Sequence, residues 1–196
     1  MSLKTQDKVT VGLTGGILCG KSLALRAWQK AGATVLCCDE IVREISIRPT
    51  VQKKIAAALG VTERKEVARN VFASVTARKK LENILHPLVY KEIVARLKKS
   101  TTGVRVVEVP LLFEAKWEKF FDITVALITP EKLLSARAKK RGLSRMDLLG
   151  RQRAQLSQQE KAARADICVL NDGSVAALTK KINTLHKALS RIYNVK

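Results

Sequence analysis

The chain has 196 residues, about the length of one domain, and 46% of them are apolar, which is enough for a packed core. No window approaches the ~18 consecutive apolar residues of a membrane span, and the first residues lack the apolar segment of a signal peptide, so we expect a cytoplasmic protein without a membrane partner. A formal net charge of +20, from 37 basic and 17 acidic residues, favours phosphate-rich partners such as nucleotides.

The cysteines and the distribution of charge argue against two classes of protein, zinc-binding proteins and proteins with a nucleic-acid-binding arm. The four cysteines form no C-x-x-C pair and there are only two histidines, which argues against a zinc site and favours reduced thiols. Basic residues are spread along the chain rather than gathered in one tail, which argues against a dedicated nucleic-acid arm. A solvated basic surface typical of the host's proteins explains the charge equally well.

Short apolar runs alternate with helical patterns along the chain. We predict strands at 9–14, 34–38, 104–109, 123–128 and 167–170. We predict helices from Lys21 to Gly32, over 76–97 with Pro87 kinking or restarting the helix, and over 175–192. Near-continuous apolar strands of this kind are buried on both faces, so the pattern favours an α/β fold in which helices sandwich a parallel five-stranded sheet.

The run G-G-I-L-C-G-K-S at 15–22 matches the phosphate-binding P-loop, G-x-x-x-x-G-K-[ST], between the first strand and the first helix. In such a loop, backbone N–H groups and the helix N-terminus bind phosphates. Lys21 would reach the β- and γ-phosphates and the Ser22 hydroxyl would bind Mg²⁺. The predicted ATP-binding residues are Gly15, Gly16, Ile17, Leu18, Cys19, Gly20, Lys21, Ser22 and Leu23.

Two loop residues carry their own expectations. Because the middle positions bind through their N–H groups, the Leu18 side chain can point outward. The Cys19 thiol is expected among the inward N–H groups, beside a helix N-terminus and Lys21, which would lower its pKa and make it reactive.

Carboxylates follow two other predicted strands. Ligands bind beyond the carboxyl ends of parallel strands, which places Asp39 near the γ-phosphate and makes Glu108 a candidate carboxylate for the metal. An acid at a strand end can also be only a helix cap.

Five ordered segments carry a family resemblance: V-G-L-T-G-G-I-L-C-G-K-S at 11–22, C-C-D-E-I-V-R-E-I at 37–45, I-L-H-P-L-V at 84–89, E-V-P-L-L-F-E at 108–114, and the stretch from S-A-R-A-K-K-R-G-L-S through R-Q-R-A-Q-L to K-A-A-R-A-D-I-C-V-L-N at 135–171. Together they resemble the dephospho-coenzyme A kinase family over nearly the whole chain. The resemblance implies one domain over 8–196, with a helical acceptor-binding insertion at 40–100 and a lid at 131–165.

The resemblance implies a reaction in which ATP, with Mg²⁺, phosphorylates the ribose 3′-hydroxyl of dephospho-coenzyme A. Asp39 would then be the catalytic base for that hydroxyl. Arg43, one helical turn on, could hold an acceptor phosphate or could form a surface ion pair with a nearby glutamate. His86 would line the acceptor pocket together with Pro110 and Leu111, although a histidine before a proline is often structural.

The same resemblance gives the basic lid a catalytic role. Arg137 and Arg141, four apart on one helix face and followed by Arg151, could spread positive charge over the transferring phosphoryl group, whereas a solvated basic face is the alternative. Lid closure would also exclude water.

This sequence departs from the family pattern at several positions. Cys37 replaces the first Asp of D-A-D, Leu134 stands where glutamine is common, and Arg141 runs directly into Gly142 without an intervening Asp. Leu18 and Cys19 replace the usual Gly and Ser of the loop centre. Two alternatives stay open: another small-molecule P-loop kinase of the nucleoside monophosphate type, and a basic nucleic-acid-binding protein. The sequence leaves the oligomeric state open.

Overall fold

The computed structural model describes residues 7–153 and 155–195, without the side chains of Arg64, Phe72, Arg145, Asp147, Arg151 and Arg153. The chain divides into two compact units. A sheet unit runs to Leu36 and resumes at Ser100, and a helical unit spans Cys37–Lys99, close to the insertion expected at 40–100. Among the described helices, none is both long and apolar enough to cross a membrane.

The sheet contains β1 (Val9–Gly15), β2 (Thr34–Cys37), β3 (Val104–Glu108), β4 (Ile123–Ile128) and β5 (Ile167–Leu170). Their spatial order is β2-β3-β1-β4-β5, and β1 runs parallel to both β3 and β4. All five predicted strands are confirmed, with ends displaced by at most a residue or so. The three central strands β1, β3 and β4 are mostly buried, as their near-continuous apolar sequences require, whereas the edge strands β2 and β5 are more exposed.

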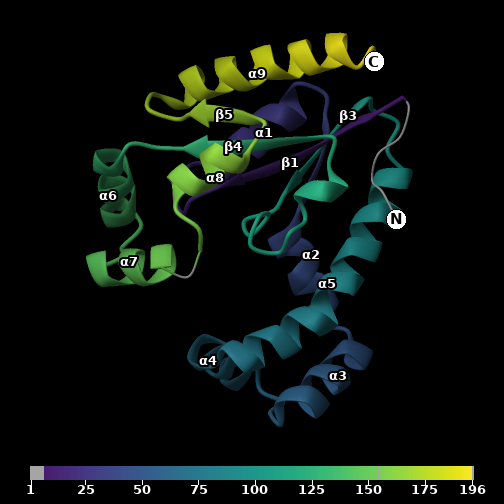
Figure 1. The fold of residues 1–196 in the computed structure, drawn as a ribbon, viewed down its shortest axis with the longest axis vertical. Helices are drawn as coiled ribbons and strands as arrows, with labels where there is room; N and C mark the ends of the chain where they lie inside the picture. The colour runs from purple at the N-terminus through teal and green to yellow at the C-terminus, as the bar shows by residue number, and fades with distance from the viewer. Residues whose placement is uncertain (1–6, 154, 196) are drawn as a thin grey trace. The chain divides into compact units, whose positions relative to one another are not determined.

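Helices cover both faces of this sheet (Figure 1). They are α1 (Lys21–Lys30), α6 (Glu131–Lys140), α7 (Arg145–Arg153), α8 (Gln158–Arg164) and α9 (Val175–Ile192), with a 3₁₀ turn η1 at Glu118–Phe120. On one face α1 packs against α9, where the fully buried Trp28 meets the edge of His186 at a ring separation of 5.6 Å. On the other face α8 packs against β4 and β1. Crossovers that move in opposite directions along a parallel sheet lie on opposite faces.

The helical unit contains α2 (Cys38–Ser46), α3 (Pro49–Leu59), α4 (Arg64–Ala73) and α5 (Val75–Lys98). The long α5 is its centre, since the other three helices all pack against it. Buried side chains recur on α5 every four residues at Leu85, Val89, Ile93 and Leu97. Of the two expectations for Pro87, a kink or a restart of the helix, the restart is wrong: α5 is continuous through Pro87, because packing against three helices outweighs the loss of one N–H donor.

The carboxyl ends of the parallel strands bring several segments of the sheet unit to one edge. β1 ends at Gly15, directly before the P-loop, and its Leu13 is in register with Glu108 at the end of β3. Thr129 follows β4 and Asn171 follows β5. The functional residues of the sheet unit are therefore sought at this edge.

Candidate functional site

The P-loop connects β1 to α1, as the motif predicts. Gly15 and Gly20 have positive φ values of 150° and 94°, and a side chain at Gly20 would lie 2.5 Å from the Asn171 amide nitrogen, so glycine is required there. The Lys21 ammonium folds back over the loop and donates to the carbonyl oxygens of Gly15 at 3.0 Å and Gly16 at 2.9 Å. The loop thus carries its cation at the N-terminus of α1, where phosphate binding is favoured.

Leu18 adopts a left-handed backbone conformation, with φ of 61°. This region is unfavourable for a residue with a Cβ, at a cost of about 1 kcal/mol or more. The expectation that its side chain points outward is wrong, because the side chain is half-buried and packs against the hydrophobic core. That packing helps to offset the backbone strain.

Cys19 is fully buried, and its Sγ donates a hydrogen bond to Gln158 Oε1 at 3.0 Å. Burial raises the pKa of the Cys19 thiol, and the nearby charge of Lys21 offsets this only in part. The expected low-pKa, reactive thiol facing the phosphate site is therefore wrong. The thiol belongs to the hydrophobic core rather than to the phosphate side of the loop.

Polar groups behind the loop hold its backbone in place. The Cys19 carbonyl oxygen accepts from the Asn171 amide at 2.8 Å and from the Thr129 hydroxyl at 3.3 Å. Gln158 accepts from the Thr129 N–H at 2.8 Å and donates to the Thr129 carbonyl at 2.9 Å. Sequence reasoning missed all three residues, although Thr129 and Asn171 directly follow predicted strands and could have been found by that position.

The lid arginines differ in their surroundings. The half-buried Arg137 of α6 donates from Nη1 to the Leu18 carbonyl at 3.0 Å and to the Thr129 hydroxyl at 3.1 Å. This joins α6 to the P-loop and places the Arg137 charge beside the loop. Arg141 caps the end of α6 and is exposed. The Arg151 side chain lies outside the described residues.

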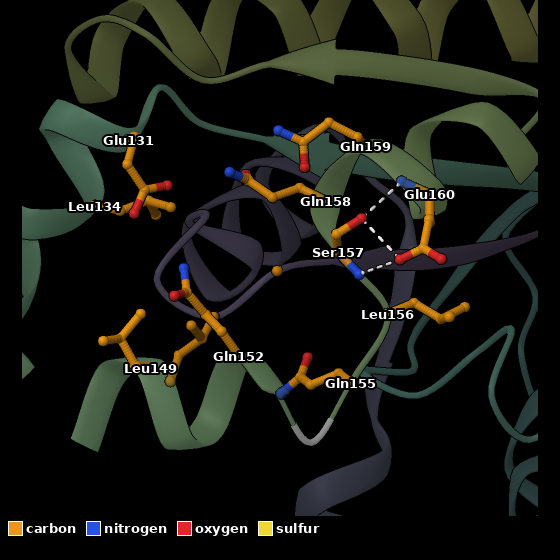
Figure 2. A pocket seen from close by; sticks show the side chains of 12 residues that line it. Glu131, Leu134, Leu149, Gln152, Gln155, Leu156, Ser157, Gln158, Gln159 and Glu160 are labelled. Carbon is orange, nitrogen blue, oxygen red and sulfur yellow. Dashed lines mark hydrogen bonds between the residues drawn. The ribbon is translucent and has the colours of Figure 1, made fainter. Parts of the chain in front are cut away.

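A cavity of about 410 Å³ lies between the start of the P-loop and the lid helices. Gly16 and Ile17 form its wall on the loop side, and α6, α7 and the residues that lead into α8 close it (Figure 2). In this view Leu149 and Gln152 of α7 and Gln158 of α8 lie around the loop. Apolar and polar side chains both line the cavity, and the glutamine and glutamate groups beside a phosphate-binding loop suit a polar, phosphorylated ligand.

A second network missed by the sequence analysis lies behind the segment after β3. The Lys161 ammonium of α8 lies 3.1 Å from Glu114 Oε1 and donates to the Pro110 carbonyl oxygen at 2.6 Å. The side chain of Lys161 is completely buried. Leu111, the other predicted acceptor residue of this segment, is 39% exposed and available to a ligand.

The other predicted acceptor residues belong to the helical unit. Asp39 is exposed in the first turn of α2, and Arg43, one turn later, donates from Nε to the Asp39 carbonyl oxygen at 3.5 Å. Among the described side chains Arg43 forms no ion pair with a glutamate. Burial lowers the pKa of His86 on α5, which favours its neutral form at pH 7. A largely apolar cavity of about 310 Å³ between α2, α3, α4 and α5 is lined in part by Arg43.

The structure therefore brings Lys21, Ser22, Glu108 and Arg137 into one unit, and Asp39 into the other. Ser22 is exposed at the start of α1, whereas Glu108 is 5% exposed at the end of β3. Among the described residues, no three His, Cys, Asp or Glu side chains gather as a metal cluster. The roles predicted for these residues stay predictions.

The loop at the end of β1, the parallel five-stranded sheet and the helices on both of its faces define a P-loop kinase fold. Shikimate kinase from Aquifex aeolicus shares the fold with a TM-score of 0.53 at 16% identity, over 92% of this chain and 98% of that one. Dephospho-CoA kinase from Campylobacter jejuni shares it with a TM-score of 0.68 at 24% identity, over 93% and 97%. TT1252 from Thermus thermophilus reaches a TM-score of 0.82 at 29% identity, over 93% and 98%.

A family model for dephospho-CoA kinase matches residues 9–177. A dephospho-CoA kinase from Protochlamydia amoebophila is 34% identical over 197 residues, covering 93% of this chain and 97% of the relative. Another from Acinetobacter baylyi is 34% identical over 187 residues, covering 90% and 96%. The chain belongs to the dephospho-CoA kinase family.

Proposed function

We propose that this protein transfers the γ-phosphoryl group of ATP to the ribose 3′-hydroxyl of dephospho-coenzyme A, the last step of coenzyme A synthesis. The observation that carries the proposal is the P-loop between β1 and α1, with Lys21 held across it, in a chain of this family. ATP and dephospho-coenzyme A are the proposed partners, and a cytoplasmic location stays a prediction from the sequence.

The loop would bind the triphosphate. Lys21 exchanges its contacts with the carbonyls of Gly15 and Gly16 for the β- and γ-phosphate oxygens, which are stronger acceptors because they are charged. The backbone N–H groups at the start of α1 add further donors and the positive end of the helix dipole. Arg137, bonded to the Leu18 carbonyl, fixes the loop from the lid side.

The oxygen ligands near the loop fit Mg²⁺. This ion keeps several waters and is commonly held by one or two protein oxygens together with substrate phosphates, so it needs no protein cage. The exposed Ser22 hydroxyl would supply one ligand, and Glu108 would add negative charge at the end of β3. Mg²⁺ would neutralise phosphate charge during transfer.

Asp39 would act on the acceptor. Its carboxylate accepts the proton of the 3′-hydroxyl as that oxygen forms a bond to the γ-phosphorus and the bond to the β–γ bridging oxygen breaks, which releases ADP. Arg43 would hold an acceptor phosphate, supported by its place at the cavity of the helical unit. His86, Pro110 and Leu111 would complete the acceptor surface.

The lid would supply charge and exclude water. Arg137 and Arg141 would stabilise the negative charge that spreads over the γ-phosphoryl oxygens in the transition state. The cavity between the loop and the lid would close around the reacting groups, which limits phosphoryl transfer to water.

A coupled ADP-release assay tests the proposal. We expect rapid ADP formation only when Mg²⁺ and dephospho-coenzyme A are both present, and a product whose added phosphate lies on the 3′-oxygen. Comparable ADP formation with AMP, CMP or shikimate would contradict this acceptor and favour another small-molecule kinase.

A further inference from the structure

The buried Lys161 has an acceptor for each of its three protons. Its Nζ donates to the Pro110 carbonyl oxygen at 2.6 Å, pairs with Glu114 Oε1 at 3.1 Å and lies 3.4 Å from Gln155 Oε1. No part of this side chain is exposed, so the charge is held entirely by protein groups.

These acceptors belong to different parts of the site. The Pro110 carbonyl also accepts from the hydroxyl of Thr14, the residue directly before the P-loop glycines, at 3.2 Å. Glu114 Oε1 also accepts from the N–H of Leu156 at 2.9 Å. Gln155 and Leu156 lie in the connection between α7 and α8, along the edge of the cavity beside the loop (Figure 2). Lys161 thus contacts both the segment after β3 and the connection between α7 and α8. The shared Pro110 carbonyl oxygen links this ammonium to Thr14 at the end of β1.

Stability alone is a weak reason for such a pair. Buried ion pairs are often no more stabilising than apolar side chains of similar volume, because both charges must be desolvated. Both charges of this pair are bonded to segments that lie far apart in the sequence, Lys161 to Pro110 and Glu114 to Leu156, and this arrangement points to a positioning role.

We propose that Lys161 and Glu114 are positioning residues that fix the connection between α7 and α8, within the expected lid, to the Pro110–Glu114 segment, so that the lid closes in register with the acceptor. Neither side chain is assigned a contact with a substrate. A lid that moves as a unit needs a fixed attachment to the rest of the protein. A small displacement of the catalytic groups lowers the rate by a large factor. The inference rests on the proposed function, since the acceptor is taken to be dephospho-coenzyme A.

The test compares Lys161→Met with the double variant Lys161→Met/Glu114→Gln. The single variant leaves the half-buried Glu114 carboxylate without its cation, so we expect a lower melting temperature. The double variant removes both charges and keeps an oxygen for the Leu156 N–H, so we expect most of the melting temperature to return. Its kcat/KM for dephospho-coenzyme A should nevertheless stay about 10-fold or more below wild type. ATP affinity, measured by calorimetry without acceptor, should change by less than about twofold, because Asn171 and Thr129 still hold the loop.

Lys181→Met is the matched control. It removes an exposed ion pair with Asp172 at 3.0 Å and an exposed hydrogen bond to the Leu170 carbonyl oxygen at 2.7 Å, in the same unit, and should leave kcat/KM unchanged. A double variant with wild-type kcat/KM overturns the proposal, as does failure of both Lys161 variants to fold, since either result assigns the pair to stability alone. If the wild-type protein itself forms no ADP with dephospho-coenzyme A, the proposed function fails instead.

Discussion

Asn171 donates its side-chain amide to the Cys19 carbonyl oxygen at 2.8 Å, across 152 residues of sequence. The same amide nitrogen lies where a side chain at Gly20 would be, so the residue after β5 fixes both the path of the P-loop and its need for glycine. The hydrogen bond holds the Cys19 carbonyl oxygen in one direction. This supports the loop conformation in which backbone N–H groups bind the phosphates.

Asn171→Ala should therefore weaken ATP binding. The loss of a hydrogen bond to a buried carbonyl costs about 1–1.5 kcal/mol, so the Kd for ATP should rise roughly 10-fold. Calorimetric titration with ATP and Mg²⁺ measures this. Asn183→Ala, at an exposed position of α9, is the control. An unchanged Kd in the Asn171 variant would mean that the remaining contact from Thr129 suffices.

Leu18 should tolerate glycine better than valine. Glycine adopts a φ of 61° without strain, whereas a β-branched residue is strongly disfavoured there. We expect Leu18→Val to lower the free energy of unfolding by about 1 kcal/mol more than Leu25→Val, the same truncation in α1. Leu18→Gly should retain ATP binding. Thermal unfolding and ATP titration check both, and equal effects at the two leucines would refute the backbone argument.

Cys19 should resist alkylation in the absence of nucleotide. Burial raises the pKa of both the Cys19 and the Cys168 thiol, but Cys19 is fully buried whereas Cys168 is exposed, so the reagent reaches only Cys168 readily. Iodoacetamide followed by peptide mapping should modify Cys168 roughly 10-fold faster or more. Cys19→Ser should keep activity, because a hydroxyl can also donate to Gln158. Rapid, ATP-protected labelling of Cys19 would restore the expectation drawn from the sequence.

The substitution Asp39→Asn tests whether Asp39 is the catalytic base for the 3′-hydroxyl. The substitution keeps the shape of the side chain and removes its charge and its proton affinity, so kcat should fall by about 10²-fold or more. The Kd for ATP should stay near the wild-type value. Glu40→Gln, the neighbouring exposed acid in the first turn of α2, should have little effect. Near-normal turnover in the Asn variant would leave Asp39 with a local structural role in α2.

Alanine substitutions at Arg137 and Arg141 should affect different kinetic quantities. Arg137→Ala removes the bond to the Leu18 carbonyl as well as a charge, so both ATP affinity and kcat should fall. Arg141→Ala removes only an exposed charge, so kcat should fall by about 10-fold or more while ATP affinity stays the same. Lys140→Ala, the exposed neighbour, is the control in single-turnover kinetics. A silent Arg141 variant would make that residue part of the solvated basic surface.

The sequence by itself determined the strands, the sheet class and the phosphate loop. These follow from local patterns: apolar runs that suit buried parallel strands, and a glycine-lysine spacing whose chemistry is carried by the backbone. The helix that begins at Lys21 followed in the same way, and the strand ends predicted at 14 and 109 lie one residue from the observed ends at Gly15 and Glu108.

Only the tertiary structure decided which way the loop side chains face and what holds the loop. The side chains of Leu18 and Cys19 are oriented by their packing against the hydrophobic core. Lys161 pairs with Glu114, which is distant in the sequence, because α8 packs on the sheet next to the segment after β3. Contacts of this kind depend on chain segments that are far apart in sequence, and burial reverses the pKa shift that nearby positive charge suggests for Cys19. Local sequence patterns carry no information on these long-range contacts or on the burial of Cys19, because both are properties of the packed interior.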